Sequence, residues 1–600
     1  MPGLSLLFSR TSIDAQISER FEAKLKEMRF FHGYNSEILY EDKKAIIGFS
    51  GYDGYPISKY DSGDFVVFLE GKIYSRDEND ISAILKDITE TAFQDNTSNL
   101  PGVLKKRLVD LDGEFWFTAI DKPNQRLLIV NDALGKLPLY YAESSDGLTI
   151  SREISFVQKL NNVSEFDRFG TAQFLMLRYP LGERTIYSGI KKLPYASFMI
   201  AADGNIPSAP VSYHQWDINT LYGKLSIEEC AEKLSFEAKR AVINRNASNI
   251  SERPVIALSG GLDSRAVLGS LKTADVDILA ASSINHARSN SYDVSIAEKV
   301  ADSLNVEFMK IQLEKPGFED YEKIAEIKPG LNNVVMANAL GLYRAILDKL
   351  PYGSDFYTGD GGASMKTPYR SQTGIKSGDH FLQQVFHTPA VFAGEDLKKL
   401  LGLGIADLID DFEPEILKYR AETWSEKYFY YTVFDYLTNF GYEGEDRSRY
   451  FFWTQTPFEA IPFYIYALSI PDRFKTGLKL MSRFLKMCDP RLLDIVYADY
   501  GARPDSAKVR SKLMLKGFMK RHPALLKKIR KIVFPRAYKP KPVEGDMRDY
   551  ALTALNQAGH LSGIMDLDYL KQLLHKPLSS SRFNLLLSLI LAAARNRAKT

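Results

Sequence analysis

The sequence has 600 residues, of which 45% are hydrophobic and 12% aromatic, so it can bury several substantial cores. Its net charge of +2 gives no indication of a nucleic acid partner, and its two cysteines, Cys230 and Cys488, exclude a disulfide framework and a cysteine-based zinc site. The N-terminus has no basic segment leading into an apolar core, and the late apolar run 585–594 is too short to span a bilayer. We therefore expect a cytoplasmic protein without a transmembrane segment.

The first two hundred residues contain many short β-type runs and few helical segments. The β-type runs are 45–49, 65–69, 114–120 and 126–130. Helical periodicity occurs at 81–93 and 103–111. This pattern predicts an α+β unit built on stacked sheets.

Three segments of this unit resemble one enzyme family. Leu111-Asp-Gly-Glu-Phe-Trp-Phe, the run 131–141 that begins Asn131-Asp-Ala-Leu-Gly-Lys, and the run 185–194 are similar to the N-terminal glutaminase domain of the glutamine-hydrolysing asparagine synthetase family. The resemblance implies a sandwich of the N-terminal-nucleophile type. In that family an N-terminal cysteine attacks glutamine and uses its own amine as the base.

The nucleophile and the glutamine contacts of that family are replaced in this sequence. Pro2 stands where the family has cysteine, and proline has no nucleophilic side chain. The family's Asn-Gly-Glu appears as Glu70-Gly-Lys72, which replaces both the amide-binding asparagine and the ammonium-binding glutamate. A rival nucleophile, Ser5, has no free α-amine beside it. We therefore expect a retained sandwich without glutaminase chemistry.

The second half is organised around the stretch 254–271. Its apolar run Val255-Ile-Ala-Leu258 predicts a buried parallel strand, Ser259-Gly-Gly a tight turn, and the following residues a helix. Ligands bind at such strand-to-helix turns in α/β sheets, where glycines admit close approach and helix N–H groups favour anions. Because Asp263 would repel a bare phosphate, the pattern indicates phosphate together with Mg²⁺. A glycine-rich turn without a ligand is the alternative.

This stretch resembles the pyrophosphate-binding loop of ATP pyrophosphatases. The run 278–284 predicts a second parallel strand, followed by a helix, so we expect a doubly wound sheet of the adenine-nucleotide-hydrolase type with helical additions. Ser282, at the end of that strand, would lie near the adenine. The residues that the resemblance assigns to ATP or pyrophosphate are Leu258, Ser259, Gly260, Gly261, Asp263, Ser264, Ser282 and Gly359.

A glycine-rich turn at 356–364 is similar to the family's Gly-Glu-Gly-x-Asp-Glu turn. The alignment places Asp360 on the family's first acid, which helps to orient the substrate, and Ala363 on the aspartate that binds Mg²⁺. Asp263 would then be the only assigned carboxylate ligand of the metal, supported by ATP phosphates and water, or Asp360 would move to serve it. Asp360 could also be an ordinary Asp-Gly turn residue.

Lys479 and Arg483 match a Lys-x-x-x-Arg helix of the family, after the similar segments 456–458 and 469–471. The two side chains would share one helical face. The family lysine balances charge in the transition state. A solvated basic helix is the alternative, because Lys475 and Lys486 fit the pattern less closely.

The resemblance divides the chain into a glutaminase-like domain (1–205), a linker (206–225) and an ATP pyrophosphatase domain (226–600). Residues 506–543 contain thirteen Lys or Arg and no Asp or Glu, which makes them a candidate surface for an anionic partner or, alternatively, a solvated helix pair. We expect no nucleic acid partner, and a homodimer is a further candidate.

The resemblance implies ATP-dependent amide formation with ATP and Mg²⁺. A substrate carboxylate, on a small molecule or a peptide, would be adenylated and then attacked by an amine, which releases AMP and pyrophosphate. Relatives without the cysteine, the β-lactam synthetases and lasso-peptide cyclases, use an amine already on the substrate. The alternatives are a degenerate nucleotide-binding scaffold and an ammonia-dependent asparagine synthase.

Overall fold

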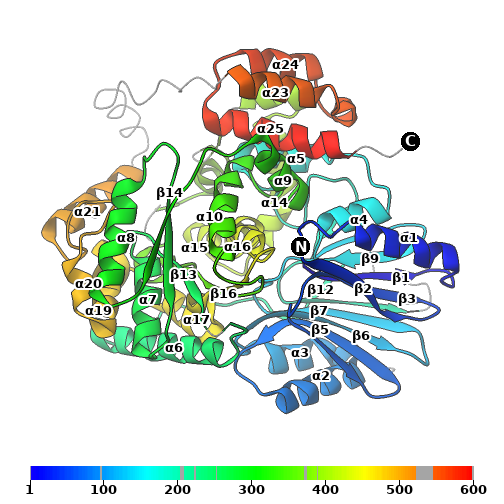
Figure 1. Cartoon of the computed structure of the whole chain (residues 1–600), viewed down its shortest axis with the longest axis horizontal. Helices are drawn as coiled ribbons and strands as arrows, with labels where there is room; N and C mark the ends of the chain where they lie inside the picture. The colour runs from blue at the N-terminus through cyan, green and yellow to red at the C-terminus, as the bar shows by residue number, and fades with distance from the viewer. Residues whose placement is uncertain are drawn as a thin grey trace.

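The structure is a computed structural model. It describes residues 2–94, 97–202, 209–221, 225–251, 253–370, 374–387, 390–392, 394–521 and 545–596. Three sheets organise these residues: two antiparallel sheets at the N-terminus and one parallel sheet in the second half (Figure 1).

The N-terminal part is a sandwich of two six-stranded antiparallel sheets, which confirms the predicted stacked sheets. The first sheet has the order β10 (Lys191–Lys192), β8 (Tyr140–Glu143), β9 (Gly147–Ser151), β1 (Gly3–Ser9), β3 (Ala45–Tyr52), β2 (Tyr34–Glu41). The second has the order β12 (Val211–Ser212), β11 (Ser197–Ala202), β7 (Arg126–Asn131), β6 (Gly113–Asp121), β5 (Phe65–Ile73), β4 (Ile57–Asp61).

Two pairs of helices cover the outer faces of this sandwich. Helices α1 (Ala15–Lys26) and α4 (Ile154–Leu160) share a small apolar cluster with the first sheet. Helices α2 (Glu78–Ala92) and α3 (Leu100–Leu108) share another with the second sheet. The helices predicted from periodicity are therefore present, and each buries its apolar side against a sheet.

The second half contains a five-stranded parallel sheet, as predicted. Its order is β15 (Phe308–Gln312), β14 (Leu279–Ile284), β13 (Val255–Ala257), β16 (Asp355–Tyr357), β17 (Trp453–Gln455). One face packs against α6 (Ile227–Ala247), α7 (Asp263–Thr273), α8 (Ser291–Ser303) and α19 (Lys479–Cys488). The other face shares a core with α9 (Phe318–Ile327), α10 (Ala337–Leu347) and the first N-terminal sheet. The sandwich and the parallel sheet are thus joined by one continuous apolar core.

Additional helices cover the end of the molecule that carries the C-terminal segments α23, α24 and α25 (Figure 1). Their largest apolar cluster also takes in α5 (Arg168–Leu177) of the N-terminal part. The other helices are α11 (Ala363–Lys366), α12 (Gly378–Leu382), α13 (Gly394–Leu401), α14 (Ile405–Leu417), α15 (Trp424–Tyr430), α16 (Tyr442–Ser448), α17 (Ile461–Ser469), α18 (Asp472–Lys475), α20 (Arg491–Asp494), α21 (Ala507–Arg521), α23 (Gly545–Leu555), α24 (Leu567–His575) and α25 (Ser580–Arg595).

The predicted linker contains a short strand of the second sheet. Strand β12, inside the predicted linker, pairs with β11, and the side chains of Tyr213 and Trp216 are buried. Helix α6 begins after this region with a capping box formed by Ser226 and Glu229. The domain limits 1–205 and 226–600 stay a prediction.

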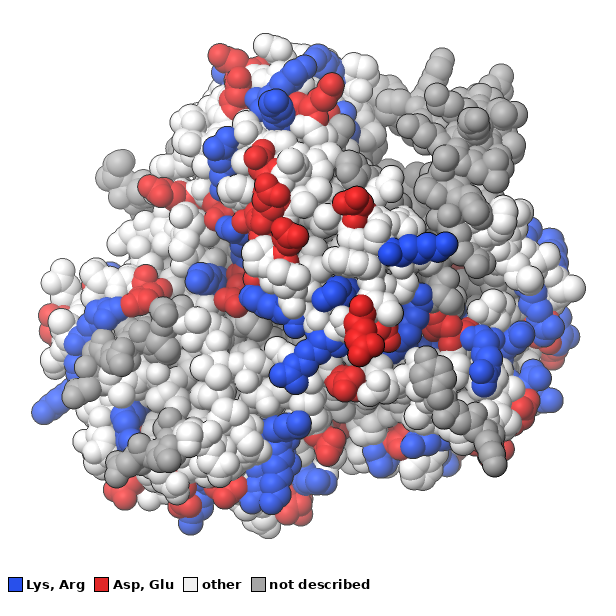
Figure 2. Space-filling view, turned by 180° about the vertical axis from the view of Figure 1, so that it is seen from behind, with Lys and Arg blue, Asp and Glu red and all other residues white. Residues whose placement is uncertain are grey.

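Charge is mixed over the described surface. Figure 2 shows Lys and Arg interspersed with Asp and Glu on one face. Of the basic segment 506–543, helix α21 is described, and residues 522–543 lie outside the described residues. No helix among the described residues has the length and apolar character needed to cross a bilayer.

Candidate active site

The loop between β13 and α7 is held together by its own serine side chains. The N–H of Ser259 donates to Ser264 Oγ at 3.1 Å, and the two hydroxyl oxygens are 3.0 Å apart. The N–H of Gly261 donates to Ser259 Oγ at 3.2 Å. Ser259 is exposed whereas Ser264 is buried. The loop therefore offers hydroxyl and N–H groups at the carboxyl end of the central strand, where α/β sheets bind ligands.

Gly260 is required by the packing of the protein itself. A Cβ at this position would lie 2.8 Å from the carbonyl oxygen of Asp293 and from the Cβ of Ala498. The sequence predicted that this glycine allows a ligand to approach the backbone. The structure gives another reason for a glycine here, its packing against Asp293 and Ala498. Around Gly261 the Ser259 hydroxyl, at 3.1 Å, is the single described neighbour within 4 Å. Gly261 is thus the glycine that leaves room beside the loop.

Arg265 anchors the loop and was missed by the sequence argument. Its guanidinium is fully buried and donates to the carbonyls of Leu492, Ile495 and Val496 at 2.9–3.0 Å. Burial lowers its pKa to about 10. Its position directly after Asp263-Ser264 indicated that it could lie close to the loop. Nothing in the sequence identified the distant carbonyl groups to which it donates.

The turn after β16 lies directly on this loop. A Cβ at Gly359 would lie 2.5 Å from the backbone nitrogen of Ser264, and a Cβ at Gly362 would lie 2.7 Å from the Cβ of Asp263. The hydroxyl of Thr358 donates to Asp360 Oδ2 at 2.6 Å, which fixes the carboxylate at the turn. The two motifs that were predicted to form one site are therefore in contact through their backbones.

Two of the residues assigned to ATP, Leu258 and Ser282, belong to neighbouring parts of the parallel sheet. Leu258, directly after β13, has a buried side chain, and its N–H donates to the carbonyl of Ala281 at 2.9 Å. Ser282 follows on β14 and is 8% exposed. The contact of Leu258 with ATP and of Ser282 with the adenine remains a prediction.

Asp263 does not fit a metal site built by the protein. Its Oδ2 accepts a hydrogen bond from Lys366 Nζ at 2.6 Å, and Oδ1 is buried without a hydrogen-bond partner. Ala363 supplies no carboxylate, and one oxygen of Asp360 is occupied by Thr358. Among the described residues no three His, Cys, Asp or Glu side chains gather as metal ligands. Each of the two acids thus has one carboxylate oxygen engaged by a neighbouring side chain, Asp263 by Lys366 and Asp360 by Thr358.

The predicted basic helix is present, but its two residues differ in setting. Lys479 is the first residue of α19 and is exposed, while Arg483 Nε pairs with Glu228 Oε1 at 2.9 Å on the surface. Lys475, weighed as a looser match, is completely buried, and burial lowers its pKa to about 7. The role of Lys479 stays a prediction, and Arg483 contacts α6 instead of a loop residue.

A cavity of about 590 Å³ opens beside the turn. Its lining combines apolar side chains with groups of both charges. The lining includes Tyr343, Thr358, Asp360, Phe440, Glu445 and Arg447. A mostly apolar cavity with a few convergent polar groups is typical of a small-molecule site. This is where an acceptor substrate could meet a nucleotide held on the loop.

Glu445 lines this cavity, and it interacts electrostatically with a second buried acid, Glu459; nothing in the sequence pointed to either residue. The two residues are 5% and 1% exposed, and Glu445 Oε2 and both carboxylate oxygens of Glu459 are buried without a hydrogen-bond partner. Burial raises the pKa of both, and the nearby Asp360 carboxylate raises it further. Gly361 lies over Glu459, because a Cβ there would be 2.8 Å from its Cγ. Two such groups cannot both ionise easily, so the pair holds a proton.

Pro2, which the resemblance aligns with the family's nucleophile, lies in a packed part of the sandwich. Pro2 is buried against Gly51, and the Glu70 carboxylate accepts hydrogen bonds from the Leu4 N–H and the Tyr55 hydroxyl, both at 2.7 Å. Lys72 reaches the parallel sheet instead, where its Nζ lies 3.6 Å from Asp355 Oδ1. Glu70 and Lys72 therefore perform structural tasks at the positions of the family's glutamine contacts.

A continuous chain of buried ion pairs runs from this pocket to the parallel sheet. Each member is less than 2% exposed, and representative distances are 2.8 Å from Arg449 to Glu114 and 2.9 Å from Lys136 to Glu114. In order of contact the residues are Glu70, Arg152, Asp446, Arg449, Glu114, Lys136 and Glu459. Removing one partner of such a pair leaves an uncompensated buried charge. This series of ion pairs therefore holds the sandwich in a fixed position relative to the candidate active site.

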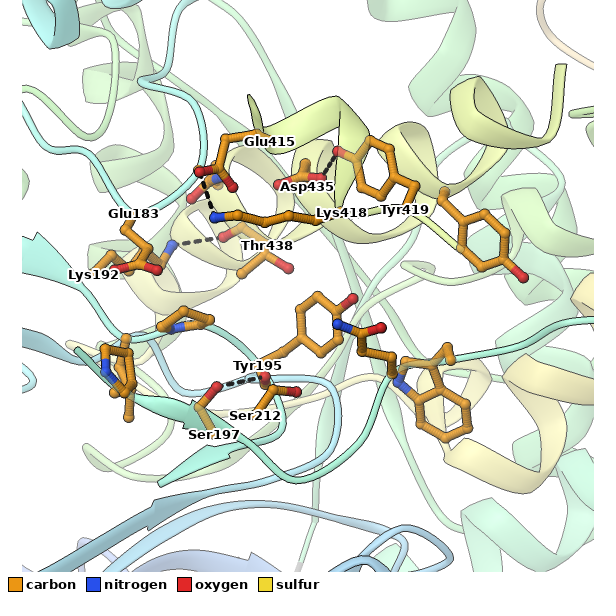
Figure 3. Close-up of a pocket in the computed structure, with 18 of the residues that line it drawn as sticks. Glu183, Lys192, Tyr195, Ser197, Ser212, Glu415, Lys418, Tyr419, Asp435 and Thr438 are labelled. Carbon is orange, nitrogen blue, oxygen red and sulfur yellow. Dashed lines mark hydrogen bonds and ion pairs between the residues drawn. The ribbon is translucent and has the colours of Figure 1, made fainter. Parts of the chain in front are cut away.

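A second cavity, of about 260 Å³, lies between the sandwich and the helices near α14. Figure 3 shows Asp435 and Tyr419 on its wall, with the Tyr419 hydroxyl donating to Asp435. Burial, and secondly the neighbouring Glu415, raise the pKa of Asp435 to about 7. The lining residues of this cavity include none of the predicted nucleotide contacts.

Comparisons with known proteins find a domain family that is similar to the N-terminal part. Residues 35–214 match the family described as Glutamine amidotransferase domain. The chain is 24% identical to asparagine synthetase [glutamine-hydrolyzing] 1 of Bacillus subtilis (strain 168) over 307 residues. This aligned region covers 48% of this chain and 46% of the relative. The chain thus matches about half the length of that relative.

Solved structures give weaker likenesses. One is the glutamine phosphoribosylpyrophosphate amidotransferase of B. subtilis complexed with ADP and GMP, with 10% identity, coverage of 55% of this chain and 92% of that one, and a TM-score of 0.23. Another is the NMN synthetase of Francisella tularensis, with 14% identity, coverage of 50% and 97%, and a TM-score of 0.17. Neither likeness is used below.

Proposed function

We propose that the protein is an ATP-dependent carbon–nitrogen ligase that forms AMP and pyrophosphate, related in its chemistry to asparagine synthetase. The observation that carries this proposal is the contact between two turns: the Ser259–Ser264 loop and the Asp360 turn meet at adjacent strand ends, beside the 590 Å³ cavity. The matched relative, at 24% identity, supports it.

In the first step a substrate carboxylate oxygen attacks the α-phosphorus of ATP. The bond from that phosphorus to the bridging oxygen breaks, and pyrophosphate leaves. Negative charge on the departing group would be stabilised by the N–H and hydroxyl groups of the loop, which are already oriented by the Ser259–Ser264 contacts. We assign Lys479 to charge balance at the α-phosphate, and Asp360 to orientation of the substrate.

In the second step an amine attacks the acyl carbon of the adenylate, and AMP leaves. The amine must lose a proton as the carbon–nitrogen bond forms. We assign this proton to the Glu445–Glu459 pair, because Glu445 lines the cavity and burial raises the pKa of both carboxyl groups above the ordinary glutamate value. An acid pair in an apolar wall has the properties of a general base.

The amine would come from outside the sandwich. Pro2 has no nucleophilic side chain, the Glu70 carboxylate is held by the Leu4 N–H and the Tyr55 hydroxyl, and buried ion pairs link Glu70 to Glu459. The amine is therefore free ammonia or, as in intramolecular amide closure, a group on the substrate. An ammonia-dependent asparagine synthase remains one form of this proposal.

A second candidate function is a nucleotide-binding scaffold without turnover. Ala363 motivates it, since the turn lacks a carboxylate that the family resemblance implies. Titration calorimetry with ATP, run beside a pyrophosphate-release assay over a panel of carboxylates, distinguishes the two. Binding with release supports the ligase, whereas binding without release for every carboxylate supports the scaffold. Absence of ATP binding contradicts both.

A further inference from the structure

The ammonium group of Lys366 lies beside the carboxylate that was expected to bind a metal ion. Its Nζ is 2.6 Å from Asp263 Oδ2, and the two side chains are 22% and 29% exposed. Helix α11 begins at Ala363 and ends at Lys366, so the residue without a carboxylate and the residue with an ammonium share one helical turn. This short helix therefore has alanine where the resemblance implies an acid, and it carries an ammonium group at its other end.

The surroundings of Asp263 favour a cation at this point. Burial raises the pKa of its carboxyl, the carboxylates of Asp360 and Asp499 raise it further, and Lys366 opposes them. The negative charges of Asp263, Asp360 and Asp499 therefore lie near one another, and Lys366 is the cation that hydrogen-bonds to Asp263. A lysine ammonium has three donors. One is used by Asp263, which leaves two for oxygens of a ligand.

A resident divalent cation would find too few ligands here. Mg²⁺ prefers near-octahedral oxygen ligation at 2.0–2.1 Å, with one or two carboxylates and the phosphates of the substrate. Asp263 Oδ2 is occupied by Lys366, Thr358 holds Asp360, and the Gly362 backbone lies against Asp263 where a side chain would otherwise be. In the described part of the chain, the position beside Asp263 is held by the Lys366 ammonium group.

We propose that Lys366 takes the place of a protein-bound divalent cation, and that the loop binds the pyrophosphate end of ATP through an ammonium bridge from Asp263 to a phosphate oxygen. This inference rests on the proposed nucleotide site. Pyrophosphate binds without a divalent cation, and the lysine keeps the charge repulsion between Asp263 and the phosphate small. Mg²⁺ that accompanies ATP is then carried by the nucleotide and needs no carboxylate at position 363.

The test is titration calorimetry with inorganic pyrophosphate, in EDTA and again with MgCl₂. The unmodified chain should bind pyrophosphate in EDTA. Lys366→Met should weaken this binding by about 10–100-fold, as expected for loss of a charge-assisted hydrogen bond. Lys376→Met, which removes an exposed lysine from the same region of sequence, is the matched control and should bind as the parent does. Thermal melts of each variant verify folding.

A double variant makes the inference sharper. Lys366→Met combined with Ala363→Asp removes the ammonium and restores a second carboxylate, so it should bind pyrophosphate with MgCl₂ and fail to bind it in EDTA. Binding by the parent that requires Mg²⁺ and is unchanged in Lys366→Met would overturn the inference and leave the proposed function standing. If neither ATP nor pyrophosphate binds under any of these conditions, the proposed function itself is wrong.

Discussion

Gly359 lies directly against the backbone nitrogen of Ser264, and this contact joins the two turns of the candidate site. A Cβ at position 359 would be 2.5 Å from that nitrogen. The contact has backbone on both sides, so neither turn can yield by a side-chain rotation. The position of the Asp360 turn relative to the loop is therefore set by the absence of one side chain.

Gly359→Ala should separate the two turns and weaken ATP binding. Overpacking of this kind costs about 1–3 kcal/mol, so the midpoint of thermal unfolding should fall as well. Gly563→Ala, at a position with no heavy atom within 4 Å of the added Cβ, is the matched control and should leave both quantities unchanged. Calorimetric ATP binding by Gly359→Ala at the parent's affinity would show that the turns do not act together.

Much of the fold was predictable because its pattern is local. The strand at 255–257, the loop and helix α7 follow from four apolar residues, two glycines and helical spacing, and the neighbouring strand β14 follows from the run 278–284. The alternation of short strands in the first half likewise predicted stacked sheets. These features depend on residues that are adjacent in sequence.

The chemistry around the loop was less predictable because it depends on distant residues. Lys366 is 103 positions from Asp263, and no periodicity links them. Glu445 and Glu459 are 85 and 99 positions from Asp360 in the sequence, and their proximity to it arises from the pairing of strands β16 and β17. Arg483 matched a motif by spacing, yet its side chain pairs with Glu228.

Replacing Glu445 should separate the two half-reactions. Glu445→Gln removes the proton acceptor, so amide formation should fall by about 10²–10⁴-fold, while carboxylate-dependent exchange between ATP and pyrophosphate should change little. The measurement compares exchange with amide product for a carboxylate that supports turnover. Glu422→Gln, at an exposed position, serves as the control. Equal losses in both half-reactions would indicate a structural role for Glu445.

The chain should have no glutaminase activity, and restoring the nucleophile alone should not create it. In Pro2→Cys the glutamine pocket would still contain the Glu70 carboxylate, which is held by Leu4, Tyr55, Trp116 and Arg152. Glutamate release from glutamine should therefore stay at the level of buffer for the parent and for Pro2→Cys. Release by the parent above that of a Lys479→Ala control would contradict the proposal.

Asp435 should make stability depend on pH. Its pKa is raised from 3.8 to about 7 in the folded chain, so the folded state resists ionisation. Ionisation of Asp435 therefore lowers the free energy of unfolding. This loss of stability is absent below about pH 4, grows as the pH rises from about 4 to about 7, and is complete above about pH 7. Asp435→Asn should therefore raise the melting temperature at about pH 8 and change it little at about pH 4. Asp410→Asn, on an exposed surface, should have no such pH dependence.

The central claim is that this chain converts ATP to AMP and pyrophosphate at the Ser259–Ser264 loop. ³¹P NMR of the products, with ATP and a panel of carboxylates and amines, tests it most directly. The account predicts AMP and pyrophosphate from the parent chain and none from Asp263→Asn, which keeps the shape of the side chain but cannot hold the Lys366 ammonium by charge. Release of ADP and phosphate, or unchanged AMP formation by Asp263→Asn, would contradict it.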